Sequence, residues 1–289
     1  MERGNTSSSS AATEFPFTAA DFQTIVGIVY KRSGIVLNAH KRDMTYSRLS
    51  RRLRALGLRS FRDYCALLES REGDGEASFL IDAITTNLTK FFREAHHFDF
   101  LKEHVLAPGA QRRNGERSHI RLWSAGCSTG EEPYSIAMVA AALQREAMAD
   151  WDLRVLATDL DTNVVKKARA GIYPRACLEN VPAAMRETFF ERRPEDRNTV
   201  QVRRNIQDLV SIRQLNLLSP WPFHGKFDAI FCRNVMIYFD AATKAALIER
   251  FHAQLKEGGW LFVGHSESLL DHQARFKLCG RTVYRKIGQ

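Results

Sequence analysis

Short apolar segments alternate with helical ones from residue 120 onward, and this order restricts the fold more than any other feature of the chain. Strands are expected over 120–124, 153–158, 227–232 and 260–264, and helices from about Glu131, from about Thr162 and over 241–255, with a turn at Gly258–Gly259. Such β-α-β-α order is typical of parallel strands with helices on both faces. We therefore predict an α/β fold with a Rossmann-like, doubly wound, mostly parallel sheet.

The stretch over residues 171–215 interrupts this alternation. Residues 200–203 and 209–213 have the composition of short strands and are flanked by polar turns. We expect a small antiparallel β subdomain to be inserted here.

The residues that precede this part have helical periodicity. Helices are expected after a capping box at Thr18 and Asp21, from about Lys41 to Leu56 with a stop near Gly57, and over 61–69 and 78–88, with Gly73 and Gly75 in the turn between the last two. We predict a small all-helical domain over 15–90, followed by the α/β domain over 91–289. The polar, Ser-rich residues 1–14 are expected to form a flexible tail.

Basic residues are concentrated in one helix of the predicted helical domain. The whole chain has 42 Lys plus Arg against 33 Asp plus Glu, a net charge of +9. Residues 41–62 alone contain eight Lys or Arg and one acidic residue, Asp43, so this segment accounts for most of the excess. A solvated helix face is the ordinary explanation, but charge of one sign at this density favours a surface that recruits an acidic partner.

Several classes of protein are excluded by composition. No apolar run has the roughly 18 to 20 residues that a membrane helix needs, and residues 1–13 lack the apolar core of a secretory signal, so a reducing cytoplasm is the default environment. The five cysteines contain no C-x-x-C pair, and there is no H-E-x-x-H motif. We expect neither a disulfide framework nor a metal site, since the adjacent rings of His96 and His97 should diverge on a helix.

A loop of small residues follows the first predicted strand and opens a helix, in the sequence Ser124-Ala-Gly126-Cys-Ser-Thr-Gly130-Glu131-Glu132. Such a loop lets a ligand approach backbone N–H groups, although a tight turn without a ligand has the same appearance. Two carboxylates at the helix start would repel a pyrophosphate and suit a ligand with positive groups. This pattern favours S-adenosylmethionine, whose sulfonium and ammonium are cationic and which has no phosphate.

Acidic residues end the second strand of this unit. Asp159 or Asp161 lies where nucleoside-binding α/β folds place the carboxylate that accepts hydrogen bonds from ribose hydroxyls. Either residue could instead cap the following helix, and the two roles could be divided between them.

Two further polar segments are candidates for the same crevice. Arg233, Asn234 and Tyr238 follow the strand over 227–232, although a surface loop would also explain them. The segment Thr85-Thr-Asn87-Leu-Thr89-Lys-Phe-Phe-Arg93-Glu joins the two predicted domains, where it could line a ligand cleft or simply cap a helix.

These motifs together resemble the chemotaxis receptor methyltransferases of the CheR family. The resemblance covers residues 18–286 and includes T-T-N-L-T-x-F-F-R-E, W-S-A-x-x-S-T-G-E-E-P-Y-S, F-D-A-I-F-C-R-N-V-M-I-Y-F and G-H-S-E. It implies transfer of a methyl group from S-adenosylmethionine to glutamate side chains of chemoreceptors, which gives methyl esters. It also implies a cytoplasmic protein that is recruited to membrane receptor arrays and binds no nucleic acid, and we expect a monomer.

The resemblance also implies roles for particular residues. Arg93 and Tyr238 are expected beside the reacting methyl group, and Arg48, Arg51, Arg52 and Arg54 on the surface that docks the receptor. Cofactor contacts are expected from Asn87, Thr89, Arg93, Gly126, Glu132, Asp159, Asn216, Leu217, Arg233 and Asn234. Some family members bind a receptor pentapeptide through a Gly-rich turn beside an Arg in the β insertion. Glu191–Thr199 contains no Gly, so the sequence leaves open whether this tether is used.

Two other functions stay open at the level of sequence. One is a regulatory module that binds S-adenosylmethionine without turnover, against which Arg93 and Tyr238 argue. The other is a nucleic-acid methyltransferase that uses the basic helix, against which the absence of a recognised RNA- or DNA-binding module argues.

Overall fold

The computed structural model describes residues 14–110, 118–147 and 151–288, which divide into two compact units. The first contains the described residues up to Arg32 together with Val36–Ile84, and the second contains Ser33–Ile35 and the chain from Thr85 onward. The predicted tail lies outside the described residues except for Glu14. In the part of the chain that is described, no helix is both long and apolar enough to cross a bilayer.

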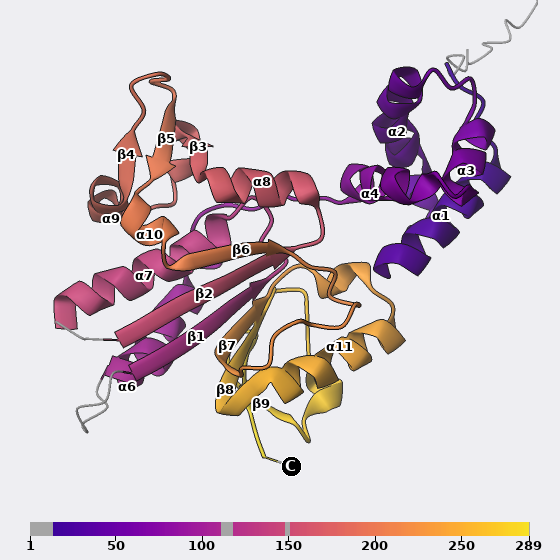
Figure 1. The fold of residues 1–289 in the computed structure, drawn as a ribbon. Coiled ribbons are helices and arrows are strands. Elements are labelled where there is room, and N and C mark those ends of the chain that lie inside the picture. Colours follow the sequence, from indigo (N-terminus) through magenta and orange to yellow (C-terminus); the bar gives the residue numbers. More distant parts are fainter. Residues whose placement is uncertain (1–13, 111–117, 148–150, 289) are drawn as a thin grey trace, which may run out of the picture. The chain divides into compact units, whose positions relative to one another are not determined.

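The first unit is all helical (Figure 1). It contains α1 (Ala19–Ser33), η1 (Ala39–Lys41), α2 (Arg42–Leu56), α3 (Phe61–Glu69) and α4 (Gly73–Ile84). The capping box is confirmed, since the Thr18 N–H and hydroxyl donate to Asp21 and the Asp21 N–H donates to the Thr18 hydroxyl. Gly57 ends α2 in the left-handed conformation, with φ of 67°, which a glycine adopts without a steric cost.

The last helix of this unit corrects the sequence prediction. Gly73 and Gly75 do not form a turn, because α4 begins at Gly73 and ends at Ile84. Thr85 and Asn87, which follow the helix, belong to the second unit, and their side chains donate to Asp161 of the same unit at 2.9 and 2.7 Å. The predicted domain boundary at residue 90 therefore falls within the second unit as the structure divides the chain.

The second unit is built on a seven-stranded sheet in the order β6-β2-β1-β7-β8-β10-β9 (Figure 1). Its strands are β1 (Ser118–Ala125), β2 (Trp151–Asp159), β6 (Val210–Gln214), β7 (Phe227–Cys232), β8 (Leu255–Val263), β9 (Phe276–Gly280) and β10 (Val283–Lys286). The strands from β6 to β8 are parallel, and β10 and β9 complete the sheet antiparallel. The predicted mostly parallel α/β sheet is confirmed.

Helices cover both faces of this sheet. The principal ones are α7 (Glu131–Ala147), α8 (Thr162–Ala170) and α11 (Ala241–Gln254), and the chain enters the unit through α5 (His96–Phe100), the π-helical η2 (Leu101–Leu106) and α6 (Ala107–Ala110). Successive β1 residues serve opposite faces: Leu122 packs in the cluster that contains α7, and Trp123 in the cluster that contains α11. Burying such side chains stabilises the fold by roughly 1.5 to 3 kcal/mol each.

A three-stranded antiparallel sheet in the order β3-β5-β4 forms the insertion. Its elements are β3 (Ile172–Pro174), η3 (Arg175–Leu178), α9 (Ala183–Phe189), β4 (Phe190–Arg192), β5 (Thr199–Val202) and α10 (Arg204–Gln207). The insertion is smaller than predicted, because 210–214 form β6 and pair with β2 of the main sheet. The predicted turn at Gly258–Gly259 lies within β8, where the pairing with β7 shifts register and Gly258 has φ of 69°. The remaining elements are η4 (Met236–Tyr238) and η5 (Leu270–His272).

Candidate active site

Most of the predicted site residues of the second unit lie where β1, β2, β6 and β7 end. Gly126 follows β1, Asp159 ends β2, Asn216 and Leu217 follow β6, and Arg233 follows β7. The N–H of Leu215 donates to the carbonyl of Asp159 at 2.9 Å, which brings the β6 and β2 ends together. Carboxyl ends of adjacent parallel strands form the usual ligand crevice of an open α/β sheet.

The glycine loop is held tightly at this edge. Gly126 has φ of +88°, and its N–H donates to the Thr158 carbonyl at 2.8 Å. A Cβ on Gly126 would lie 2.3 Å from Cγ2 of Val235, so the loop after β1 touches the loop after β7 through a position that only glycine fits. Ser128, with φ of 49°, donates its N–H to Asp159 Oδ2 at 2.7 Å and its hydroxyl to the Asn87 carbonyl at 2.8 Å.

The two aspartates divide their roles. Asp161 caps α8, since its side chain accepts the N–H groups of Asn163 and Val164, and it also accepts the Asn87 amide. Asp159 accepts the N–H groups of Ser128 and Asp161 at 2.7 and 3.0 Å and therefore faces the glycine loop. Burial raises the pKa of Asp159 to about 6. This arrangement leaves Asp159 as the candidate for ribose and assigns capping to its neighbour.

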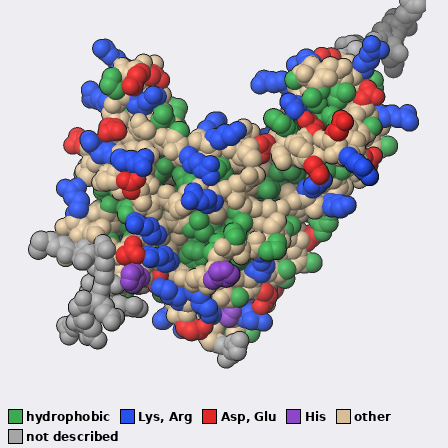
Figure 2. All heavy atoms as spheres, in the orientation of Figure 1, with side chains coloured by type: hydrophobic (Ala, Val, Ile, Leu, Met, Phe, Trp, Pro, Cys, Tyr) green, Lys and Arg blue, Asp and Glu red, His purple; other side chains and the backbone are tan. Residues whose placement is uncertain are grey.

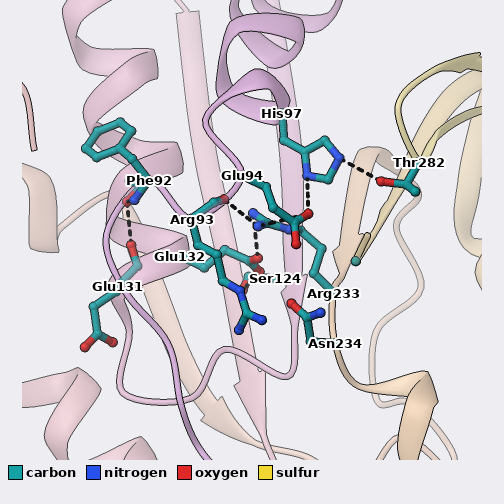
Figure 3. Close-up of polar contacts among 12 residues, drawn as sticks. Phe92, Arg93, Glu94, His97, Ser124, Glu131, Glu132, Arg233, Asn234 and Thr282 are labelled. Atoms are coloured by element: carbon teal, nitrogen blue, oxygen red, sulfur yellow. Dashed lines mark hydrogen bonds and ion pairs between the residues drawn. The ribbon is translucent and has the colours of Figure 1, made fainter. Parts of the chain in front are cut away.

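Arg233 is at the centre of a buried ion-pair network (Figure 3). Its side chain is 2% exposed, and its guanidinium nitrogens lie 3.3 Å from Glu132 Oε2 and 3.5 Å from Glu94 Oε2. It also donates to the Arg93 carbonyl. Glu132 accepts the Ser124 hydroxyl at 2.7 Å. The network thus joins β1, α7, the Arg93 segment and the β7 loop.

Burial acts on the acids of this network to different extents. It raises the pKa of Glu132, and Arg233 only partly opposes that effect. For Glu94, burial is outweighed by Arg233 and by the hydrogen bond from His265, so its pKa lies below the usual value. Burial, reinforced by Arg233, lowers the pKa of His97 to about 4. His97 is therefore neutral near pH 7.

The segment with Arg93 has an unusual backbone. Phe92 and Glu94 both adopt left-handed conformations, with φ of 53° and 58°, which cost a non-glycine residue on the order of 1 kcal/mol or more each. Arg93 donates to the Leu88 carbonyl at 3.1 Å, and its side chain is half-buried. Thr89 is also half-buried. Such backbone conformations persist where surrounding contacts impose them, as the Arg233 network does here.

The loop after β7 holds the other predicted catalytic residue. Asn234 has φ of 59°. Tyr238 is half-buried at the end of η4, which begins two residues after Asn234. The N–H of Asn234 donates to Glu267 Oε2 at 2.8 Å. Sequence reasoning gave no role to Glu267, His97 or Glu94, although Glu267 belongs to the G-H-S-E motif and Glu94 follows Arg93 directly.

Three of these side chains also form a cluster of potential metal ligands. One atom each from Glu94, His96 and His97 lies within 4.8 Å of the others, and the two imidazole rings are 4.3 Å apart rather than divergent as expected. The Arg233 guanidinium lies 3.5 Å from the Glu94 carboxylate. This positive charge disfavours a cation at the cluster, so we attribute it to the ion-pair network.

The predicted docking arginines on α2 have different surroundings. Arg48 donates to the Ala83 and Ile84 carbonyls at the end of α4, and Arg54 pairs with Glu14 at 2.8 Å. Arg52 forms a bidentate pair with the buried carboxylate of Glu76, in which Nε donates to Oε1 at 2.9 Å and Nη2 donates to Oε2 at 2.6 Å. Arg51 is exposed, and no ion pair joins it to another described side chain. Figure 2 shows Lys and Arg side chains of the helical unit at the surface, interspersed with acidic ones.

The residues present at the carboxyl edge fit S-adenosylmethionine. The Gly126 backbone leaves no room for a Cβ, acids from β2 and α7 face the loop, and the loop lacks the Lys of a phosphate-binding motif. The buried Nε of Arg233 has no hydrogen-bond partner among the described residues, so a donor that could serve an anionic group is available beside these acids. A ligand with cationic groups, one carboxylate and a neutral nucleoside matches this set.

Comparison with known proteins supports this interpretation. The model of the CheR methyltransferase all-alpha domain matches residues 20–85, and that of the CheR methyltransferase SAM binding domain matches residues 87–285. The chemotaxis protein methyltransferase of Escherichia coli (strain K12) is 48% identical over 267 residues, which cover 92% of this chain and 90% of the relative. The chain belongs to the CheR methyltransferase family.

Other CheR relatives agree with this assignment. The probable chemotaxis protein methyltransferase of Rhizobium etli is 45% identical over 261 residues, which cover 89% of this chain and 96% of that relative. As a CheR methyltransferase, the protein combines an all-alpha domain with a domain that binds S-adenosylmethionine. Among solved structures, the DszA carbon methyltransferase aligns with a TM-score of 0.37 at 15% identity, covering 84% of this chain and 47% of that one.

Proposed function

We propose that this protein transfers the methyl group of S-adenosylmethionine to glutamate side chains of chemoreceptors and forms glutamate methyl esters. The observation that supports the proposal most is the Arg233 network, because it joins Glu132, Arg93 and the loop with Tyr238 at the edge where the cofactor is expected. The names of the relatives indicate chemotaxis as the process.

The reaction requires positioning more than proton transfer. A glutamate carboxylate is already ionised near pH 7 and needs no general base. When bound, S-adenosylmethionine supplies an electrophilic methyl group on a sulfonium. Held by the residues proposed below, it would give that methyl group to a carboxylate oxygen of the acceptor and would leave as the neutral thioether. Opposite charges partly neutralise each other along this path, so a crevice that excludes water favours it.

We assign the protein's contribution to residues around the network. Asn87, Thr89, Gly126, Glu132, Asp159, Asn216, Leu217, Arg233 and Asn234, together with Arg93, form the proposed cofactor site. Arg93 and Tyr238 orient the acceptor carboxylate rather than activate it, since an arginine paired too closely with that carboxylate would reduce its nucleophilicity. The exposed Arg51 is the strongest candidate for contact with an acidic receptor surface, because the other three arginines have partners within the helical unit.

The reaction class is tested with methyl-labelled S-adenosylmethionine and receptor-containing bacterial membranes. We expect protein-bound label that mild base releases as methanol, which identifies a carboxyl methyl ester. Base-stable label would reject ester formation. Absence of transfer, with S-adenosylhomocysteine still bound in a parallel titration, would instead favour the regulatory module or a substrate that those membranes lack.

A further inference from the structure

The buried carboxylate of Glu267 accepts hydrogen bonds from four backbone N–H groups. They come from Asn234 at 2.8 Å, Val235 at 3.0 Å, Ile237 at 3.3 Å and Gly264 at 2.6 Å. The side chain is 6% exposed, and a buried carboxylate is tolerated when several N–H groups satisfy it. Two of the four donors, Asn234 and Val235, belong to the loop between β7 and η4, and a third, Ile237, belongs to η4.

That loop needs an external constraint. It holds Asn234 in the left-handed region, which is unfavourable for a residue other than glycine, and neither α-helix nor strand includes its N–H groups between β7 and η4. Glu267 supplies acceptors for the N–H groups of Asn234, Val235 and Ile237, much as an anion is bound in a backbone nest. Without the carboxylate, these donors would lose that partner, and a shielded N–H group without an acceptor is unfavourable.

Two neighbours of Glu267 make the arrangement specific. A Cβ on Gly264 would lie 2.4 Å from Nδ2 and 2.8 Å from the backbone nitrogen of Asn234, so the two loops meet at a position that requires glycine. Nδ1 of His265 lies 3.1 Å from Oε1 of Glu94. The segment Gly264–Glu267 therefore contacts both the loop after β7, which precedes Tyr238, and Glu94, which follows Arg93.

We propose that Glu267 is a positioning residue for methyl transfer, which fixes the loop over 233–238 so that Arg233, Asn234 and Tyr238 face the cofactor and the acceptor. It acts through backbone N–H groups and has no assigned contact with the reacting atoms. The inference rests on the proposed function, because it takes the roles of those three residues from it.

Glu267→Gln is the direct test, since it preserves size while replacing one acceptor oxygen by an NH₂ group that faces N–H donors. We expect S-adenosylhomocysteine to bind about 10 to 100 times more weakly, as loss of charge-assisted hydrogen bonds implies, and kcat to fall. The KM for receptor membranes should change little. Glu249→Gln is the matched control, because Glu249 pairs with Arg275 on the surface of the same unit and should leave all three quantities unchanged.

A double-mutant cycle separates positioning from a general loss of stability. If Glu267 acts through the loop, Tyr238→Phe should lower kcat less in the Glu267→Gln background than in the wild-type background. Additive effects on kcat, or binding by Glu267→Gln equal to that of Glu249→Gln, would overturn the proposal.

A conservative variant covers the case in which Glu267→Gln does not fold. Glu267→Asp keeps the charge but shortens the side chain, so S-adenosylhomocysteine should bind measurably more weakly to this variant than to the wild-type protein. Wild-type affinity in Glu267→Asp would also contradict the assignment. Because binding of S-adenosylhomocysteine is measured without a receptor, it reports on Glu267 even if no chemoreceptor is methylated.

Discussion

The carboxylate of Asp159 predicts a pH dependence of cofactor binding. Its folded pKa of about 6 lies above the usual value of 3.8 because of burial, and only the ionised form accepts hydrogen bonds at both oxygens without donating one. Affinity for S-adenosylhomocysteine should therefore be constant above pH 6 and fall as the pH decreases through 6, by up to about tenfold per unit. Titration calorimetry across this range checks the slope, and Asp159→Asn should remove it while weakening binding throughout.

The same residue has the opposite effect on folding. Because the folded pKa is raised, ionisation is harder in the folded state than in the unfolded chain. The contribution of Asp159 to stability is thus greatest below pH 3.8 and is lost as the pH rises to about 6. The site therefore gives up some folding free energy to hold an ionised carboxylate near pH 7.

A side chain at position 126 should lower the stability of the protein. Gly126→Ala places a Cβ 2.3 Å from Val235 in a left-handed backbone conformation, so we expect unfolding free energy to decrease by about 2 to 4 kcal/mol. Urea denaturation measures this loss. Val235→Ala should restore only part of it in the double variant, because relief of the contact leaves the backbone strain. Complete restoration would show that the backbone conformation adds nothing.

Substitution of Arg93 or Tyr238 should reduce turnover. Arg93→Ala and Tyr238→Phe should each lower kcat by at least about tenfold, because both are proposed to orient the acceptor carboxylate. Tyr238→Phe should leave affinity for S-adenosylhomocysteine unchanged. Normal kcat in both variants, with unchanged binding, would reject this role.

At the scale of elements, two arginines of α2 are expected to differ, because Arg52 pairs with a buried acid whereas Arg51 is only proposed to contact the receptor. Arg52→Ala removes the partner of the buried Glu76 and should lower unfolding free energy by about 2 kcal/mol, since breaking a partly buried pair is costly. Arg51→Ala should change it by less than about 0.5 kcal/mol. Urea denaturation of the two variants checks the contrast.

Receptor binding, unlike stability, should depend on Arg51. Arg51→Glu is expected to raise the KM for receptor membranes several-fold without altering affinity for S-adenosylhomocysteine, because surface charge reversal acts on association. An unchanged receptor KM would exclude Arg51 as a docking residue.

Local sequence patterns predicted most elements, and the errors have identifiable physical causes. The strands over 120–124, 153–158 and 227–232 lie within β1, β2 and β7 because buried parallel strands are continuous apolar runs. β6 was misplaced in the insertion because its partner β2 is distant in sequence. The glycines at 73, 75, 258 and 259 indicated turns, but they lie in α4 and β8, where tertiary packing decides the conformation.

The sequence predicted which residues belong to the site, but not which hydrogen bonds each of them makes. Sequence placed Asp159 and Asp161 together but could not divide their roles, which depend on the backbone of Ser128. Glu267 was missed because its partners are backbone N–H groups, which every sequence contains.

At the scale of the whole molecule, the uneven charge predicts a salt effect on one substrate only. Residues 41–62 contain most of the net charge of +9, although Glu14 and Glu76 neutralise part of it. The KM for receptor membranes should rise with ionic strength, because the Debye length falls to about 8 Å at 0.15 M, whereas affinity for S-adenosylhomocysteine should not change. Arg51→Glu should show a weaker salt dependence than wild type, and equal slopes would argue against electrostatic recruitment.

The hydrogen bonds of Glu267 also bear on the order in which the site forms during synthesis. A nascent chain that ends before residue 264 contains the glycine loop, Asp159 and the β7 loop but lacks the acceptor for the N–H groups of Asn234, Val235 and Ile237. We therefore expect the crevice to remain incomplete until Gly264–Glu267 have left the ribosome. Cofactor binding by a nascent chain would then report that synthesis has passed Glu267, and not only that the strands around the crevice have been made.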